Sequence, residues 1–167
     1  MSENTAEKTG DARDAAGRQA ESAVAEPYAL EQQIGHLLRR AHQRASATFM
    51  AGIGESQFTP TQFAALAKLA DEGAVSQNRL GRLTAMDPAT MQGVVGRLLD
   101  RGLITSRPDP DDRRRTLLRL NEAGRDAVNA AIENGRQITR DTLAPLSRAE
   151  QKTLLRLLKK LGNTKTR

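Results

Sequence analysis

Residues 87–121 read DPATMQGVVGRLLDRGLITSRPDPDDRRRTLLRLN, and this stretch decides the fold. Asp87 followed by Pro88 is typical of a helix start, because an aspartate caps free backbone N–H groups and proline needs no N–H in the first turn. Gly102 can adopt the left-handed conformation that ends a helix. Four apolar residues between these signals share one helical face: Met91, Val94, Val95 and Leu98. The pattern predicts a capped helix with one buried and one outer face.

Two short strands are expected after this helix, over residues 103–107 and 115–120, where apolar and polar residues partly alternate. Between them, Pro108 to Asp111 excludes a helix and indicates a hairpin tip longer than two residues. The sequence therefore predicts a β-wing behind the helix.

Upstream, apolar spacing predicts a first helix over about 28–50, ended by Gly52 and Gly54. Thr59-Pro60-Thr61-Gln62 carries a helix cap and a capping-box glutamine, so a second helix should start at Pro60. Ser76 should cap a short third helix through Leu83. The third and fourth helices, joined by a tight turn, have a helix-turn-helix outline.

Downstream, Asn121 is expected to cap a long helix, which Pro145 stops. Ser147 opens a capping box for a last helix. The leucines of that helix form one stripe, which we interpret as dimer or scaffold core in preference to a ligand site: Leu154, Leu155, Leu158 and Leu161.

The chain has 167 residues and no cysteine, which predicts one folded domain without disulfides and favours a cytoplasmic location. Residues 1–27 hold three basic and six acidic side chains, so the formal charge of +6 becomes +9 over residues 28–167. The segment is poor in apolar residues, and we expect a disordered acidic tail there. The expected regions are this tail (1–27), an N-terminal dimerisation helix and linker (28–57), the winged helix-turn-helix (58–120) and C-terminal dimerisation helices (121–167).

The outer face of the fourth helix is small and polar. Gly93 and Gly96 lie on it, and each costs about 1 kcal/mol of helix stability relative to alanine. Their presence indicates that bulk is excluded there, either by a DNA duplex or by another helix packing closely. The wing favours a nucleic-acid surface. Its three adjacent arginines could belong to a solvated turn, but guanidinium groups are favoured on phosphates and in a narrow minor groove. Asp112 can hold one of these arginines extended. The expected DNA contacts are Ser76, Asn78, Ala89, Thr90 (to a phosphate or a thymine methyl), Gln92 (to adenine), Gly93, Arg97 (to a phosphate or guanine), Asp112, Arg113, Arg114 and Arg115.

Residues 80–124 resemble the winged helix of the MarR family of bacterial transcription regulators. The family's wing motif Asp-Pro-x-Asp-Arg-Arg is matched by residues 109–114, and its Asn/Thr-Glu-x-Gly helix start by residues 121–124. The resemblance covers about residues 28–162. It implies a mainly α fold with a small β-wing, in which the winged helix-turn-helix is inserted between dimerisation helices. It further implies a homodimer that places helix four in the major groove of an operator and the wing arginines in the minor groove. Repression would be relieved by a small aromatic, anionic ligand.

Residues 28–44 are similar to the family's regulators of nicotinate degradation, which implies a hydroxylated nicotinate as effector. The expected lining for such an aromatic carboxylate is His36, Arg40, His42 and Phe63. Arg40 would supply the charge and the Phe63 ring would stack. Taken alone, the two histidines suit a surface or interface role better than a ligand contact. Since the two histidines lie six residues apart without a third ligand, no metal or other cofactor is expected.

The sequence thus predicts a homodimeric, DNA-binding, ligand-responsive repressor with no membrane association. The alternative is a winged helix for protein contact or nucleic-acid architecture without an effector. We expect no enzymatic activity, since the chain shows no Ser/His pair, phosphate-binding glycine loop or metal-spaced cluster.

Overall fold

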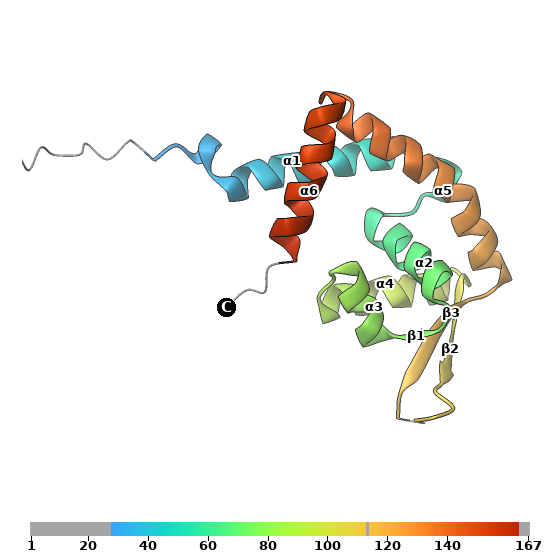
Figure 1. The fold of residues 1–167 in the computed structure, drawn as a ribbon. Coiled ribbons are helices and arrows are strands. Elements are labelled where there is room, and N and C mark those ends of the chain that lie inside the picture. Colours follow the sequence, from blue (N-terminus) through green and yellow to red (C-terminus); the bar gives the residue numbers. More distant parts are fainter. Residues whose placement is uncertain (1–27, 113, 164–167) are drawn as a thin grey trace, which may run out of the picture. The chain divides into compact units, whose positions relative to one another are not determined.

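The computed structural model describes residues 28–112 and 114–163, and the expected disorder of residues 1–27 lies outside them. Within this part the chain is mainly helical, with a small antiparallel sheet (Figure 1). The described residues divide into two units, with the boundary between Leu37 and Leu38.

Helix α1 (Ile34–Gly52) begins later than predicted, and the expected start at residue 28 is wrong. A separate 3₁₀ turn, η1 (Leu30–Gln32), precedes it, and Gln33 has an extended backbone with ψ 128°. Because one extended residue interrupts the helical hydrogen-bond ladder, apolar spacing alone could not place this boundary. At its other end α1 stops at Gly52, and Gly54 has φ +74°, so the predicted termination is confirmed.

The remaining helices begin where their caps predicted. Helix α2 (Pro60–Glu72) has the Thr59–Gln62 capping box, and α3 (Gln77–Thr84) is capped by Ser76. Helix α4 (Pro88–Asp100) is capped by Asp87, α5 (Glu122–Leu143) by Asn121, and α6 (Arg148–Gly162) by the Ser147 capping box.

The sheet has three strands in the order β1-β3-β2, one more than the sequence predicted. Strands β2 (Ile104–Pro108) and β3 (Thr116–Leu120) form the expected hairpin, which extends away from α2, α3 and α4 in Figure 1. The additional strand β1 (Val75–Ser76) pairs with β3 through Val75 and Leu118. This pairing ties the start of the helix-turn-helix to the base of the wing.

One hydrophobic core joins α2, α3, α4, α5 and the sheet. Its largest fully buried side chains come from all of these helices and from the segment before α2: Ile53, Phe58, Leu66, Leu69, Leu80, Met91, Val94, Leu98 and Val128. By contrast, α6 buries none of its residues, and α1 buries only Phe49. The core therefore fixes the winged helix, whereas α6 presents its apolar side chains outward.

The linker between α1 and α2 includes a second 3₁₀ turn, η2 (Gly54–Ser56), and is held from two sides. Asn134 of α5 donates to the Ile53 carbonyl at 3.2 Å. From the end of α4, Arg101 donates to the Ser56 carbonyl at 2.9 Å and lies 4.7 Å above the centre of the buried Phe58 ring. These contacts stabilise the orientation of α4 relative to the linker.

Candidate nucleic-acid interface

Helix α4 is fixed by its inner face and leaves its outer face open. Met91, Val94, Val95 and Leu98 are buried, as predicted. The helix ends as predicted too, because Gly102 has φ +64° and Leu103 N–H donates to the Leu98 carbonyl at 3.0 Å. Both helix ends and the inner face are thus constrained by the protein, and the outer side chains are free to meet a partner.

The two glycines of this outer face have no packing role within the described residues. Among the described residues, a Cβ built at Gly96 would meet no atom within 4 Å, and the three atoms nearest to one at Gly93 would all belong to the Arg97 side chain. The alternative that these glycines admit another helix of the same chain therefore finds no support in the described part of the molecule.

Arg97 lies back over Gly93, one helical turn earlier. Both terminal nitrogens of its guanidinium are 3.5 Å from the position that a Gly93 Cβ would take. Because the guanidinium offers five donors in a fixed plane, this placement presents donors at the middle of the outer face.

At the start of α4, Asp87 accepts two hydrogen bonds from Thr90. The Thr90 backbone N–H donates to Oδ1 at 2.9 Å and its hydroxyl donates to Oδ2 at 2.6 Å. These bonds, the hydroxyl bond first, lower the pKa of the Asp87 carboxyl below its ordinary value. The carboxylate is therefore charged at neutral pH and holds the Thr90 rotamer.

The wing carries two acid–arginine pairs. Asp112 pairs with Arg114 at 3.4 Å, as the sequence predicted for one arginine, and the Arg114 side chain is 93% exposed. Asp109 lies 3.8 Å from Arg115 and is itself buried, with its carboxylate accepting the Asp111 N–H at 3.0 Å. The carboxylates thus hold the turn while the arginines extend into solvent. Arg113 lies outside the described residues.

Sequence reasoning missed Asp109 as a positioning residue. Five acidic or proline residues in succession, 108–112, gave no signal about which carboxylate would fold inward. In the structure the Asp109 N–H donates to the Arg115 carbonyl at 2.9 Å and closes the tip. The inward carboxylate is that of Asp109, which lies beside the Arg115 guanidinium.

Helix α3 contributes polar groups beside α4. Ser76 accepts the Arg79 N–H at 3.4 Å, and Asn78 is exposed in the first turn. A depression of 610 Å³ lies between the two helices, lined by both, with Asn78, Arg82 and Met91 among its residues.

The residues expected to bind an effector lie on α1 and α2. Phe63 is half-buried, its ring 5.7 Å from that of Phe49, so an aromatic corner forms between α1 and α2. Arg40 and His42 are exposed on α1, and His36 belongs to the other unit. The described residues contain no group of three or more acidic or histidine side chains that could hold a metal ion.

Among the described helices, none combines the length and apolar character that a bilayer crossing requires. A helix pair with an open polar reading face, followed by an arginine-tipped hairpin, defines the class of winged helix-turn-helix proteins.

Comparison with known proteins narrows this class. Residues 56–115 match the sequence profile of the MarR family. The HTH-type transcriptional repressor NicR of Pseudomonas putida is 41% identical over 135 residues, which are 81% of this chain and 85% of that protein. The chain belongs to the MarR family, whose named relatives are transcription regulators.

Two solved structures share both the fold and much of the sequence. A probable transcriptional regulator from Pseudomonas aeruginosa is 53% identical, with a TM-score of 0.77 over 80% of this chain and 99% of that one. BpsR of Bordetella bronchiseptica, whose DNA binding is regulated by 6-hydroxynicotinic acid, is 40% identical, with a TM-score of 0.79 over 83% of this chain and 99% of that one. The expected fold class and the resemblance to the nicotinate regulators are confirmed.

Proposed function

We propose that this protein is a homodimeric, sequence-specific DNA-binding repressor of the cytoplasm, released from a palindromic operator by a small aromatic carboxylate of the hydroxynicotinate class. The observation that carries the proposal is the outer face of α4, where Gly96 leaves space that no described atom fills and Gly93 is approached by the Arg97 guanidinium. A duplex in close approach would use this space, with Gln92 and Arg97 directed at base edges and phosphates.

The wing supports the same assignment. Arg114 and Arg115 extend from a tip that two carboxylates hold in shape. Guanidinium groups are favoured in a narrow minor groove, where the negative potential is high. The wing would therefore contact the groove next to the one that α4 occupies.

Dimerisation is supported by α6, whose leucines are 36–56% exposed although they form apolar stripes on a regular helix: Leu154, Leu155, Leu157, Leu158 and Leu161. An exposed apolar face of this kind is typical of a surface that is covered by a partner. A second copy of the chain is the partner that a palindromic operator requires, because two-fold DNA symmetry mirrors two-fold protein symmetry.

The effector proposal rests on the aromatic corner of Phe49 and Phe63 and on the likeness to BpsR, whose DNA binding is regulated by 6-hydroxynicotinic acid. Arg40 would pair with the carboxylate, and His42 would hydrogen-bond a ring substituent. The role expected for His36 stays a prediction from the sequence. Such a ligand lowers DNA affinity only if it binds the two arrangements of the reading helices unequally.

The test is selection of duplexes from a random pool, followed by titration of the best site. We expect a palindrome with half-sites about 10 base pairs apart and an affinity that falls steeply with salt. Adding 6-hydroxynicotinate should weaken binding and raise the melting temperature of the free protein. Binding that ignores base sequence would favour the alternative, an architectural module. Binding that is specific but unchanged at saturating 6-hydroxynicotinate would exclude that effector.

A further inference from the structure

The first turn of α4 contains a closed pair, Asp87 with Thr90, whose hydrogen-bond direction has a consequence for base recognition. A single carboxylate accepts both the backbone N–H and the hydroxyl of Thr90, at 2.9 Å and 2.6 Å. An ionised carboxylate is only an acceptor, so the hydroxyl must donate its one hydrogen to Asp87. Thr90 is exposed, and what remains of its hydroxyl on that surface is two acceptor lone pairs.

We propose that Thr90 is an acceptor-only reading residue, which recognises an exocyclic amino group in the major groove, on adenine N6 or cytosine N4. This inference rests on the proposed function, in which α4 enters that groove. Adenine and cytosine are the bases that present a donor there, whereas guanine O6 and thymine O4 are acceptors. A base with a carbonyl at this position would face the Thr90 oxygen acceptor to acceptor.

The same argument removes the phosphate contact that the sequence predicts for Thr90. Phosphate oxygens are acceptors, and Thr90 has no hydrogen left to donate. The charged Asp87 carboxylate beside it adds repulsion. Thr90 is thereby restricted to base edges.

Ser76 is the N-cap of α3, the position that Asp87 holds in α4. Its hydroxyl is arranged in the opposite way to that of Thr90. Its hydroxyl oxygen accepts the Arg79 N–H at 3.4 Å, which leaves its own hydrogen available for a phosphate. The helix-turn-helix thus carries two hydroxyls of opposite character, a donor at the start of α3 and an acceptor at the start of α4.

Two variants separate the acceptor role from a structural one. Thr90→Val keeps the shape of the side chain but has no lone pair to offer. Asp87→Ser keeps a good helix cap, since serine and aspartate are near equals at that position. It lacks the second carboxylate oxygen, Oδ2, which accepts the Thr90 hydroxyl, and it therefore frees the Thr90 hydrogen.

The experiment measures affinity for duplexes that carry each of the four bases at every half-site position. For the wild type we expect one position at which amino-bearing bases are preferred by about three- to tenfold, the range of one hydrogen bond. Thr90→Val should remove the preference at that position and leave the others unchanged. Asp87→Ser should relax the preference so that guanine or thymine is accepted as well, because the released hydroxyl can then donate as well as accept. Thr90→Val combined with Asp87→Ser should behave as Thr90→Val alone.

A change in the DNA provides the second arm. Purine in place of the preferred adenine, or pyrimidin-2-one in place of the preferred cytosine, lacks the amino group. On a duplex with either analogue, the affinity of the wild type should fall to the affinity that Thr90→Val has for the natural duplex. Thr90→Val itself should bind the natural and the analogue duplex equally well.

The proposal is overturned if Asp87→Ser leaves the base profile unchanged while its melting temperature shows a folded protein. It is also overturned if Thr90→Val weakens binding to all sequences equally and reduces the salt dependence, as loss of a phosphate contact would. Failure of the proposed function looks different. In that case the wild type binds all four bases equally at every position, and Gln92→Ala and Arg97→Ala do not create or remove a base preference.

Discussion

Helices α4 and α5 each carry two interior glycines, for opposite reasons. In α5, a Cβ at Gly124 would overlap the Leu103 carbonyl oxygen, and one at Gly135 would lie 2.8 Å from Cζ of Phe63. In α4, a Cβ at Gly96 would meet nothing within 4 Å among the described residues. The packing of the described residues therefore accounts for the glycines of α5, whereas it does not account for those of α4, which fit the proposed close approach of DNA.

The largest effect is expected for Gly124→Ala. The obstacle is a backbone carbonyl that also accepts the Asn121 N–H at 3.3 Å, so it cannot move without loosening the cap of α5. Overpacking against such a fixed group should lower the free energy of unfolding by about 3 kcal/mol. Urea unfolding at one fixed protein concentration measures this. Gly162→Ala is the control, because a Cβ there would meet no atom of the described residues within 4 Å. A normal urea midpoint for Gly124→Ala would mean that the close approach of α5 to Leu103 is absent in solution.

Gly96→Ala should give two effects of opposite sign. Alanine in a helix interior is favoured over glycine by about 1 kcal/mol, so the free protein should become more stable. Operator affinity should fall by about tenfold, or 1.4 kcal/mol, because the methyl group occupies the space left for the duplex. Thermal unfolding and fluorescence anisotropy measure the two quantities on one preparation. If both stability and affinity rise, the glycine does not serve close approach to DNA.

The contrast between these glycines also shows where sequence reasoning stops. Caps such as Thr59, Asp87 and Ser147 act on N–H groups two or three residues away, so a single local pattern predicted each helix start. Strand β1 has two residues and no periodicity, and it exists only because β3 returns beside it. A contact between residues that are far apart in sequence leaves no local signal.

The same limit applies within the site. Spacing predicted which residues of α4 face outward, because helical geometry is local. It could not predict that the Thr90 hydroxyl is already engaged, which depends on a rotamer, nor that Asp109 turns inward at the wing tip. Residue identity predicted the surface, and the hydrogen bonds determine what that surface can recognise.

Gly135→Ala should have a smaller effect than Gly124→Ala, because its obstacle is the tip of a side chain. The Phe63 ring can tilt away, and alanine improves helix propensity, so we expect a net loss of about 1 kcal/mol of unfolding free energy. In a Phe63→Leu background the same substitution should be neutral or stabilising. A double-mutant cycle measures this coupling, and additive effects would show that Gly135 and Phe63 do not meet.

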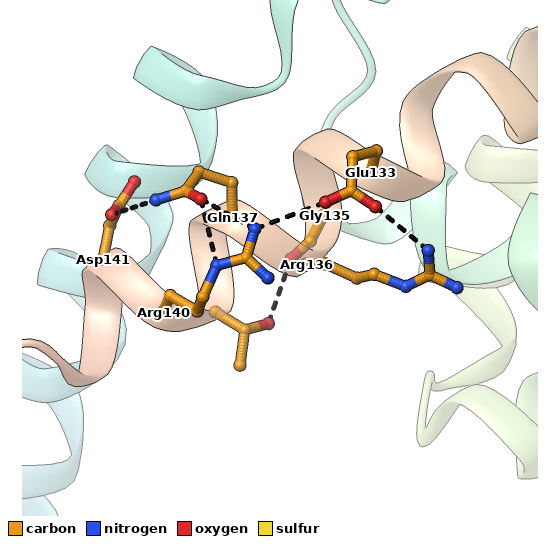
Figure 2. Close-up of polar contacts among 7 residues, drawn as sticks. Glu133, Gly135, Arg136, Gln137, Arg140 and Asp141 are labelled. Carbon is orange, nitrogen blue, oxygen red and sulfur yellow. Dashed lines mark hydrogen bonds and ion pairs between the residues drawn. The ribbon is translucent and has the colours of Figure 1, made fainter.

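The smallest effect concerns the polar network that brackets Gly135 on the exposed side of α5 (Figure 2). Glu133 accepts from Arg136 at 3.0 Å and from Arg140 at 3.3 Å, and Gln137 links Arg140 to Asp141. Such pairs, three, four and seven residues apart, reinforce a helix where glycine weakens it. The reading face of α4 has no comparable network around Gly93 and Gly96 among the described residues, since groups paired there would be unavailable to DNA.

Glu133→Gln tests this role through pH. Hydrogen bonds from Arg136 and Arg140 lower the pKa of Glu133 from its ordinary value of 4.5. A lowered pKa in the folded state stabilises the protein above the unfolded value, and this contribution is lost as the pH falls through the folded value. Between pH 5 and about pH 3, the melting temperature of the wild type should therefore fall slightly more steeply than that of Glu133→Gln. Added salt should reduce the difference because the network is exposed. Asp126→Asn, on the same helix outside the network, is the matched control. If that variant flattens the profile as much as Glu133→Gln, the effect reflects the overall charge of α5, and the bracketing of Gly135 contributes nothing separate.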